Sequence, residues 1–401
     1  KLCNFVDVYY NWAITSDLEQ KFMEATARTN EIERFKLKRG QVALTKDSET
    51  RFDIGIATYI ADDFDNVILG YHNALITPNP EKLSGKYLNA LLHTDYARTY
   101  FANNASGSGQ RYALSIDALN NFPVPLLPLA EQERIGDIFS SIDQKIALNR
   151  AINDNLEAMA KQLYDYWFVQ FDFPNEESKP YKSSGGKMVW NDKLKREIPE
   201  GWVVEKVSAL IEPIERGISY ASADLLDDSA MPMINLACFS KSGDYRTGEM
   251  KYYSGIIPGN KYVQPMDMLI ACTDMTQGAD IIGRPILASH EFEQYTFSTD
   301  LATLRPKSIA KMYLYYTLRT PFYHKYIRPF ASGTNVKHLN IAGVENHIIT
   351  VPTDSIQLKF ERTIVPVKEK QSKILNEIAL LTRQRDELLP LLMNGQVSVN
   401  Y

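Results

Sequence analysis

Four polar loops contain the side chains of this chain that are best suited to hydrogen-bonding chemistry. They lie at 45–51, 106–111, 273–279 and 332–337. Arg, Lys, Asn and Gln side chains offer several donors or acceptors, so such loops are suited to recognition rather than to breaking bonds. The alternative interpretation of each loop is an ordinary polar surface turn. The candidate contact residues are Lys46, Arg51, Gln110, Arg111, Thr273, Gln277, Asn335 and Lys337.

No motif for covalent or metal chemistry accompanies these loops. The sequence has no GxGxxG, GxxxxGK[ST], HExxH or GxSxG pattern. Its six histidines show no metal-ligand spacing. Cys3, Cys238 and Cys272 are far apart and form no CxxC pair, which predicts reduced, mostly buried thiols. We therefore expect no catalytic residue, no metal site and no cofactor bound by this chain.

Composition limits the class of protein further. The chain has 401 residues, of which 44% are hydrophobic and 23% charged, and this predicts two or three globular domains. No apolar run is long enough to span a membrane and no secretory leader precedes the first strand-like segment, so a cytoplasmic location is expected. The net charge of −5 counts against a uniformly basic nucleic-acid-binding protein, although a basic face can lie on an acidic protein.

The elements that must position the four loops occur twice. Lys86-Tyr87-Leu88 is repeated as Lys311-Met312-Tyr313, and Ala105-Ser106-Gly107-Ser108 as Ala331-Ser332-Gly333-Thr334. Val124-Pro125 is repeated as Val351-Pro352. The offset is always about 225 residues, which is far longer than a solenoid repeat. The pattern predicts two mixed α/β domains of the same fold, and the alternative is a duplication that only enlarges a scaffold.

Each copy is followed by a segment with coiled-coil periodicity. Apolar residues alternate at spacings of four and three from Ile138 to Tyr166 and from Phe360 to Leu392. The first seam is expected to include Lys145 and Met159, and kinks or boundaries are expected at Pro366 and Pro390. Two such helices would pair antiparallel with pseudo-two-fold symmetry, and the alternative is an ordinary dimerisation arm. The candidate pairing residues are Ile142, Asn149, Ile152, Leu156, Ile374, Ile378, Leu381 and Leu388.

Two longer stretches carry a resemblance to a known family. Pro123–Ile135 reads Pro-Val-Pro-Leu-Leu-Pro-Leu-Ala-Glu-Gln-Glu-Arg-Ile and leads into the first long helix. After that helix come Tyr166-Trp167-Phe168, Phe171-Asp172-Phe173-Pro174 and Ile198-Pro199-Glu200-Gly201-Trp202. In this order, and inside a repeat with two heptad helices, the chain resembles the DNA specificity (S) subunits of type I restriction–modification enzymes. The resemblance covers essentially the whole chain.

The resemblance implies an organisation for the chain. It implies an α/β (α+β) fold with two target recognition domains separated by two long antiparallel helices. The expected parts are a first recognition domain at 1–128, a spacer helix at 129–170, a connection at 171–197, a second recognition domain at 198–354 and a second spacer helix at 355–394.

The resemblance also implies partners and roles. The chain would read a bipartite target in double-stranded DNA and would dock two methyltransferase (M) subunits, with restriction (R) subunits as further partners. S-adenosylmethionine would be bound by the M subunit. Arg or Lys can contact guanine and Asn or Gln can contact adenine, so the eight loop residues become candidate DNA contacts.

Two alternatives remain open. One is an interaction scaffold of the same ancestry that has lost DNA recognition. The other is an enzyme with its own nuclease or methyltransferase activity, against which Asn79-Pro80-Glu81-Lys82 counts, because it is not the Asn/Asp-Pro-Pro-aromatic loop of an adenine methyltransferase.

Two departures from the family pattern bear on these expectations. The second copy shows Val351–Gln357 in place of the Glu131-Gln132 pair. In addition, the position equivalent to Gly201-Trp202 would lie about 25 residues before Lys1. We therefore expect the first domain to lack its opening segment.

Overall fold

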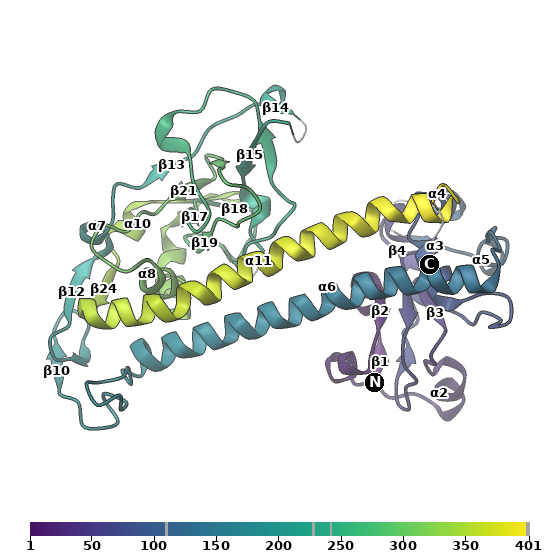
Figure 1. The fold of residues 1–401 in the computed structure, drawn as a ribbon, viewed down its shortest axis with the longest axis horizontal. Coiled ribbons are helices and arrows are strands. Elements are labelled where there is room, and N and C mark those ends of the chain that lie inside the picture. The colour runs from purple at the N-terminus through teal and green to yellow at the C-terminus, as the bar shows by residue number, and fades with distance from the viewer. Residues whose placement is uncertain (109–110, 227–228, 241–242, 398–401) are drawn as a thin grey trace. The chain divides into compact units, whose positions relative to one another are not determined.

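The computed structural model describes residues 1–108, 111–226, 229–240 and 243–397 (Figure 1). The chain forms two compact units. Unit 1 comprises Lys1–Leu148 and Leu380–Tyr401, and unit 2 comprises Asn149–Ala379. Each unit therefore contains one part of each of two long helices, α6 (Leu129–Tyr164) and α11 (Asp354–Met393).

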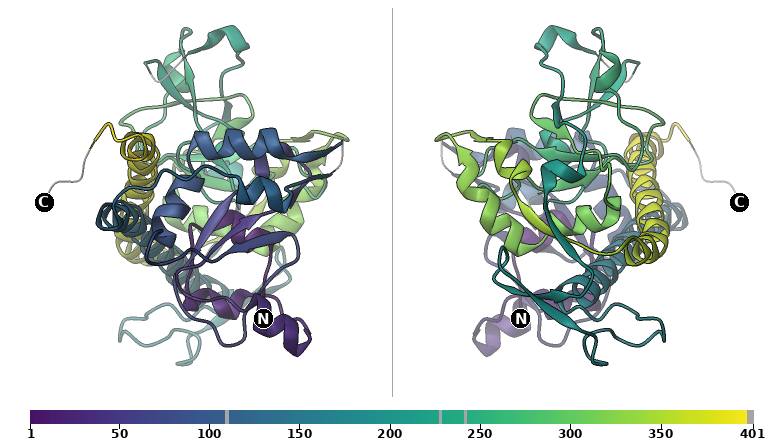
Figure 2. Two further views of the ribbon diagram at one scale, coloured as in Figure 1. Left: turned by 90° about the vertical axis from the view of Figure 1, so that its right-hand side faces the viewer. Right: turned by 90° about the vertical axis from the view of Figure 1, so that its left-hand side faces the viewer.

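A four-stranded mixed sheet lies at the centre of unit 1. Its order is β2 (Ala13–Ile14), β5 (Ala57–Ile60), β3 (Val42–Thr45) and β7 (Asn73–Ile76). Strand β3 is antiparallel to both of its neighbours, and every residue of β3 and β5 is buried. Helix α3 packs against β3 and β5 (Figure 2). The other elements are α1 (Phe5–Tyr10), α2 (Thr29–Phe35), α3 (Gly85–Leu92), α4 (Asp95–Asn104), α5 (Ile116–Asn120), β1 (Leu2–Cys3), β4 (Asp47–Ser48), β6 (Ile68–Leu69), β8 (Ser106–Ser108) and β9 (Arg111–Ala113).

Unit 2 contains a similar sheet together with a second one. The similar sheet has the order β13 (Glu215–Arg216), β21 (Leu301–Thr303), β17 (Met268–Ala271) and β19 (Pro285–Leu287). The second sheet consists of β14 (Leu225–Leu226), β16 (Lys251–Tyr253), β15 (Met231–Ile234) and β20 (Thr296–Phe297). The other elements are α7 (Val207–Leu210), α8 (Lys311–Thr317), α9 (Pro321–Ile327), α10 (Ala342–Glu345), β10 (Met188–Asn191), β11 (Arg196–Pro199), β12 (Val203–Lys206), β18 (Thr273–Asp274), β22 (Ala331–Ser332), β23 (Lys337–Leu339) and β24 (Ile348–Val351).

The sequence repeat is visible in the strand pairing. Strand β3 lies between antiparallel neighbours β5 and β7, and β17 lies in the same way between β19 and β21. The hairpin β8–β9 pairs with β4, just as the hairpin β22–β23 pairs with β18. The predicted α/β class, with two similar globular parts and two long helices, is thus confirmed.

Two buried glutamines make equivalent hydrogen bonds, one within each copy. Gln132 Oε1 accepts a hydrogen bond from Ser84 N (3.0 Å), and its Nε2 donates to Leu127 O (2.8 Å). Gln357 Oε1 accepts from Ala310 N (2.7 Å), and its Nε2 donates to Pro352 O (2.7 Å). Each side chain thereby ties the start of a long helix to the residue that caps α3 or α8. The second copy therefore lacks only the glutamate of the expected Glu-Gln pair.

The buried stripe of α6 departs from the predicted seam at several positions. Ile135, Phe139 and Ile146 are 2% exposed or less, whereas Met159 is 64% exposed and Lys145 is also exposed. The prediction that Lys145 and Met159 belong to the seam was wrong. The large rings set the phase, because Phe139 packs into the core of unit 1 and Tyr164 into the core of unit 2.

Helix α11 follows its predicted stripe more closely. Phe360, Ile364 and Gln371 are buried along it. The helix is continuous past Pro366 and Pro390, so the boundaries expected at these residues are absent from the described residues 354–393. Both prolines are exposed, and packing of the opposite face offsets the roughly 3 kcal/mol that a proline costs inside a helix.

The candidate pairing residues differ in burial. Asn149, Ile374 and Ile378 are 9% exposed or less. In unit 2, Gln371 Nε2 donates to Asn153 O (3.0 Å) and Lys368 pairs with Glu157, so the two helices run antiparallel there. The pairing role of the whole set stays a prediction, and the half-buried members are Ile142, Ile152, Leu156, Leu381 and Leu388.

The segment that follows α6 forms the aromatic core of unit 2. Phe168 contacts the rings of Tyr313 (4.7 Å between centroids) and Phe360 (4.9 Å). Trp202 stacks on Phe173 at 5.3 Å. The aromatic residues that carried the family resemblance are therefore packing residues, which join the end of α6 to the globular part of unit 2 and to the start of α11.

Candidate nucleic-acid interface

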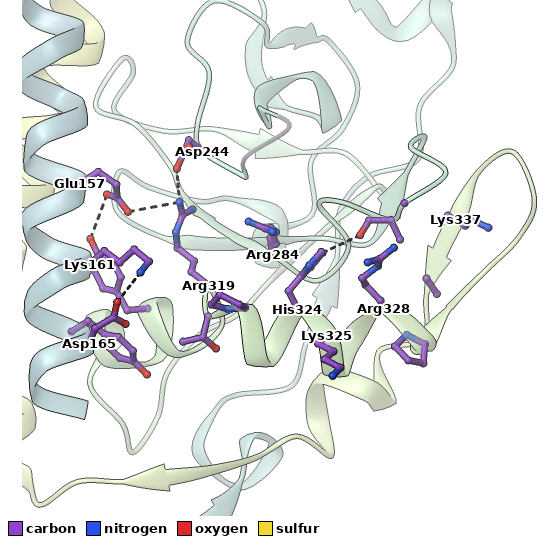
Figure 3. Close-up of a pocket in the computed structure, with 18 of the residues that line it drawn as sticks. Glu157, Lys161, Asp165, Asp244, Arg284, Arg319, His324, Lys325, Arg328 and Lys337 are labelled. Atoms are coloured by element: carbon purple, nitrogen blue, oxygen red, sulfur yellow. Dashed lines mark hydrogen bonds and ion pairs between the residues drawn. The ribbon is translucent and has the colours of Figure 1, made fainter. Parts of the chain in front are cut away.

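A cleft of about 770 Å³ opens on unit 2 (Figure 3). It is bordered by the end of α6, the loop after β18, helix α9 and the hairpin β22–β23. Three carboxylates line it, Glu157, Asp165 and Asp244. The basic and histidine side chains that line it are more numerous, namely Lys161, Arg284, Arg319, His324, Lys325, Arg328 and Lys337.

Helix α9 contributes Lys325 to these cations, and the residue that follows the helix contributes Arg328. The Thr320 side chain caps the helix by accepting a hydrogen bond from Tyr323 N, and Pro321 occupies the first turn, where its missing N–H costs nothing. Tyr323 and Ile327 point into the core. Helical spacing then directs Lys325 and Arg328 outward, and both are exposed.

Several of the cations in the cleft already have partners. Arg319 pairs with Asp244 and lies 3.7 Å from Glu157 Oε1, and Lys161 Nζ is 2.7 Å from Asp165 Oδ2. Among the residues that the structure describes, no ion pair involves Lys325 or Arg328. These two side chains are the ones best placed to meet an anionic ligand.

His324 takes part in the cleft as a neutral donor. Burial and the nearby Arg284 guanidinium lower the pKa of its imidazole, with burial the larger cause. Its Nε2 lies 3.1 Å from Ala279 O, which requires the proton on that nitrogen. His324 therefore supports the loop after β18 and contributes no positive charge near neutral pH.

The predicted contact residues of unit 2 divide into two groups. Gln277 and Lys337 line the cleft, and Asn335 is exposed on the hairpin between β22 and β23. Thr273 is only 5% exposed within β18, so its side chain does not reach the surface and the expectation for this residue was wrong. Its place in a short strand paired with β23 explains the burial.

Two predicted residues of unit 1, Lys46 and Arg111, lie near the carboxylate of Asp47. Asp47 Oδ2 lies 3.5 Å from Arg111 Nη2 and 3.2 Å from His72 Nδ1. Lys46 lies over the ring of Tyr71 (5.0 Å to the centroid). Arg51 lies over the ring of Tyr112 (5.1 Å), next to Arg111 in the sequence. Gln110 lies outside the described residues.

Two glycines fix the hairpins that carry Arg111 and Lys337. Gly107 has φ +139° and Gly333 has φ +116°, a region that L-residues rarely adopt. A Cβ atom would lie 2.1 Å from Arg111 O in the first hairpin and 2.0 Å from Val336 O in the second. Only glycine fits either position.

The described residues show no other reactive site. Cys3, Cys238 and Cys272 are buried, and this burial raises the pKa of each thiol to about 12. No cluster of three or more potential metal ligands occurs in the described part of the chain. None of its helices is long and apolar enough to cross a membrane.

Comparisons with known proteins agree with this geometry. Residues 9–158 match the family described as the type I restriction modification DNA specificity domain. The MjaIX specificity subunit of Methanocaldococcus jannaschii is 24% identical over 322 residues, which cover 78% of this chain and 69% of that one. The chain is a relative of the type I restriction enzyme specificity subunits.

Further relatives extend the likeness across the chain. The HindI specificity subunit of Haemophilus influenzae is 24% identical over 398 residues, covering 87% of this chain and 85% of its own length. The solved structure of the type I S subunit from M. genitalium has a TM-score of 0.57 at 14% identity, and covers 96% of this chain and 88% of that one. This last likeness concerns the fold alone.

Sequence reasoning missed most of the cations in the cleft. Arg284 and Arg319 are distant in sequence from the predicted loops, and only the fold brings them to the cleft. Lys325 and Arg328 did leave a signal in the sequence, because they follow a Thr-Pro helix start and alternate with the apolar residues Tyr323 and Ile327.

Proposed function

We propose that this relative of the specificity subunits recognises double-stranded DNA as a bipartite target, one half through each recognition domain. The observation that carries the proposal is the cation-lined cleft of unit 2, where Gln277 and Lys337 lie on loops equivalent to those of Arg51 and Arg111 in unit 1. Cations hold the phosphates, whereas amide and guanidinium groups read base edges.

On this proposal, the chain is a recognition and docking subunit and has no catalytic residues of its own. It binds two methyltransferase subunits, and restriction subunits are further partners. The methyltransferase subunits bind S-adenosylmethionine and methylate adenine. The similarity to specificity subunits of type I restriction enzymes supports the role of recognition subunit.

A second candidate function is an interaction scaffold that has lost DNA recognition. The observation that favours it is charge, because the chain carries a net charge of −5 and Arg319 and Lys161 in the cleft are already paired with carboxylates. Phosphate contacts account for much of the affinity of DNA-binding proteins, so paired cations would weaken binding.

The deciding experiment is co-expression with the methyltransferase subunit from the same operon, followed by mapping of adenine methylation on a random DNA library. A bipartite motif with a fixed spacer would support the proposal. A motif in one half only would restrict recognition to one domain. A stable complex that methylates no sequence would favour the scaffold.

A further inference from the structure

The strand register fixes which loop residues correspond in the two copies. Ser48, the last residue of β4, pairs with Tyr112 in the hairpin of unit 1. Asp274, the last residue of β18, pairs with Lys337 in the hairpin of unit 2. The two loops that follow therefore leave their strands at equivalent points of the fold, and they differ in length only farther along, before β5 and β19.

The third residue after each of these strands is polar and exposed. It is Arg51 in unit 1 and Gln277 in unit 2. The guanidinium of Arg51 lies over the ring of Tyr112, 5.1 Å from its centroid. Gln277 lines the cleft of unit 2 together with Lys337. Arg51 thus lies against the hairpin of its own unit, and Gln277 shares a cleft with the hairpin of the other.

Arg51 and Gln277 keep their hydrogen-bonding groups available. Within the part of the chain that the structure describes, neither side chain forms a hydrogen bond or an ion pair. The contact between Arg51 and the ring of Tyr112 is a cation–π contact, which orders the side chain and uses none of its five N–H donors for a hydrogen bond. Both side chains can therefore give all their donors and acceptors to a ligand.

The hairpin cations are engaged within the protein instead. Arg111 Nη2 lies 3.5 Å from Asp47 Oδ2. Lys337 Nζ donates a hydrogen bond to Gly333 O (2.6 Å), within its own hairpin. These contacts favour the loop residues over the hairpin cations as the groups that read bases.

A carboxylate holds each of the two loops. Asp53 Oδ2 accepts a hydrogen bond from Thr50 Oγ1 (2.8 Å), and these two residues flank the exposed arginine. The buried Asp274 accepts hydrogen bonds from Thr276 N (2.7 Å) and from Ile281 N (2.7 Å), which enclose the exposed glutamine. Both side chains therefore project from fixed turns, as base contacts of defined geometry require.

The two side chains differ in the bases that they can match. Guanine presents two acceptors, N7 and O6, in the major groove, and the fork of N–H donors of an arginine fits them. Adenine presents the acceptor N7 and the donor N6, which fit the amide nitrogen and oxygen of a glutamine. We propose that Arg51 and Gln277 are specificity-determining residues, Arg51 contacting a guanine in one half-site and Gln277 an adenine in the other. The inference rests on the proposed DNA-recognition function and assigns one base to each recognition domain.

The test exchanges the two residue types in the complete complex with methyltransferase subunits. Sequence preference is measured by selection of bound duplexes from a random library. Arg51→Gln should replace a preference for guanine by one for adenine in one half-site only, and Gln277→Arg should make the reverse change in the other half-site. Each preference should change by roughly ten-fold or more, the discrimination that one bidentate pair provides.

Two matched controls make the same exchanges at exposed positions outside both loops. Arg39→Gln in unit 1 and Gln264→Arg in unit 2 should leave both half-sites unchanged. A modified base then identifies the atom contacted. Replacing the guanine by 7-deazaguanine removes N7, so it should weaken binding of the wild type and leave that of Arg51→Ala unaltered; 7-deazaadenine serves in the same way for Gln277→Ala.

An unchanged motif in both exchanged variants would overturn the inference and leave the proposed function intact. Weaker binding of Arg51→Gln to all sequences alike, with the motif retained, would also overturn it, because Arg51 would then contact a phosphate. A wild-type complex that selects no DNA sequence would instead overturn the proposed function, and this inference with it.

Discussion

Glu157 is the centre of a partly buried charge cluster in unit 2. Its side chain is 25% exposed, that of Arg319 is 13% exposed and that of Lys368 is 9% exposed. Lys368 Nζ lies 2.5 Å from Glu157 Oε2 and over the rings of Tyr315 (5.0 Å) and Tyr316 (5.4 Å). The cluster joins α6, α11 and the globular part of unit 2.

The substitution Glu157→Gln keeps the shape of this side chain and removes its charge. Arg319 retains Asp244, but Lys368 has no other ion pair among the described residues. Breaking a fully buried pair costs about 3–5 kcal/mol, and an exposed pair contributes about 0–1 kcal/mol. Because Glu157 is a quarter exposed, we expect a loss of about 2–3 kcal/mol in the free energy of unfolding.

The double variant Glu157→Gln/Lys368→Met supplies the matched control. It removes both charges together, so it should be more stable than the single Glu157→Gln variant, with a coupling energy of about 2 kcal/mol. Equilibrium urea unfolding, followed by the fluorescence of Trp167 and Trp202 in the core of unit 2, measures these differences. Strictly additive losses in the double variant, or a loss below about 0.5 kcal/mol for Glu157→Gln, would refute the reasoning.

Three further predictions concern other parts of unit 2. The double variant Lys325→Ala/Arg328→Ala should weaken DNA binding for all sequences and reduce the slope of log affinity against log salt by about 2, and an unchanged slope in a salt titration would contradict this. Gly333→Ala should destabilise the hairpin by about 1–3 kcal/mol in urea unfolding, because its Cβ would meet Val336 O at 2.0 Å; Gly259→Ala, with open space around it, should have little effect. Burial lowers the pKa of His347 from 6.5 to about 4, so the unfolded state takes up the proton first. Stability should therefore fall by up to about 3 kcal/mol as the pH drops from about 6.5 to about 4, and it should fall less in His347→Gln; parallel pH profiles of the two proteins would contradict the assignment.

The organisation of the fold was predictable because it is encoded twice. The recurrence of Ser106-Gly107 as Ser332-Gly333 marked equivalent hairpins, and the positive φ of both glycines is the physical reason for the match. The phase of α6 was not predictable in the same way. A spacing of four and three fits two neighbouring stripes, and only the packing of Phe139 and Tyr164 into separate cores selects one of them.

The candidate site was predictable only in part. Gln277 and Lys337 were found because their loops match loops in the first copy. Arg319 was missed because it follows the buried helix α8 and lies far in sequence from the predicted loops, and only the tertiary fold brings it to the cleft wall. The prediction for Thr273 was wrong because a short polar segment after a strand is usually a loop. In this structure the segment forms the short strand β18, in which Thr273 pairs with His338 of β23.

Unit 1 is assembled from both ends of the chain, and this determines the order in which the protein is completed during synthesis. Leu389, Leu392 and Met393 belong to the same buried cluster as Phe139 and Tyr87. A ribosome therefore finishes every residue of unit 2 before it makes the last pieces of unit 1. Until the C-terminal part of α11 has been synthesised, the apolar face of unit 1 that it covers stays exposed. A chaperone or an early partner could bind this face during that interval.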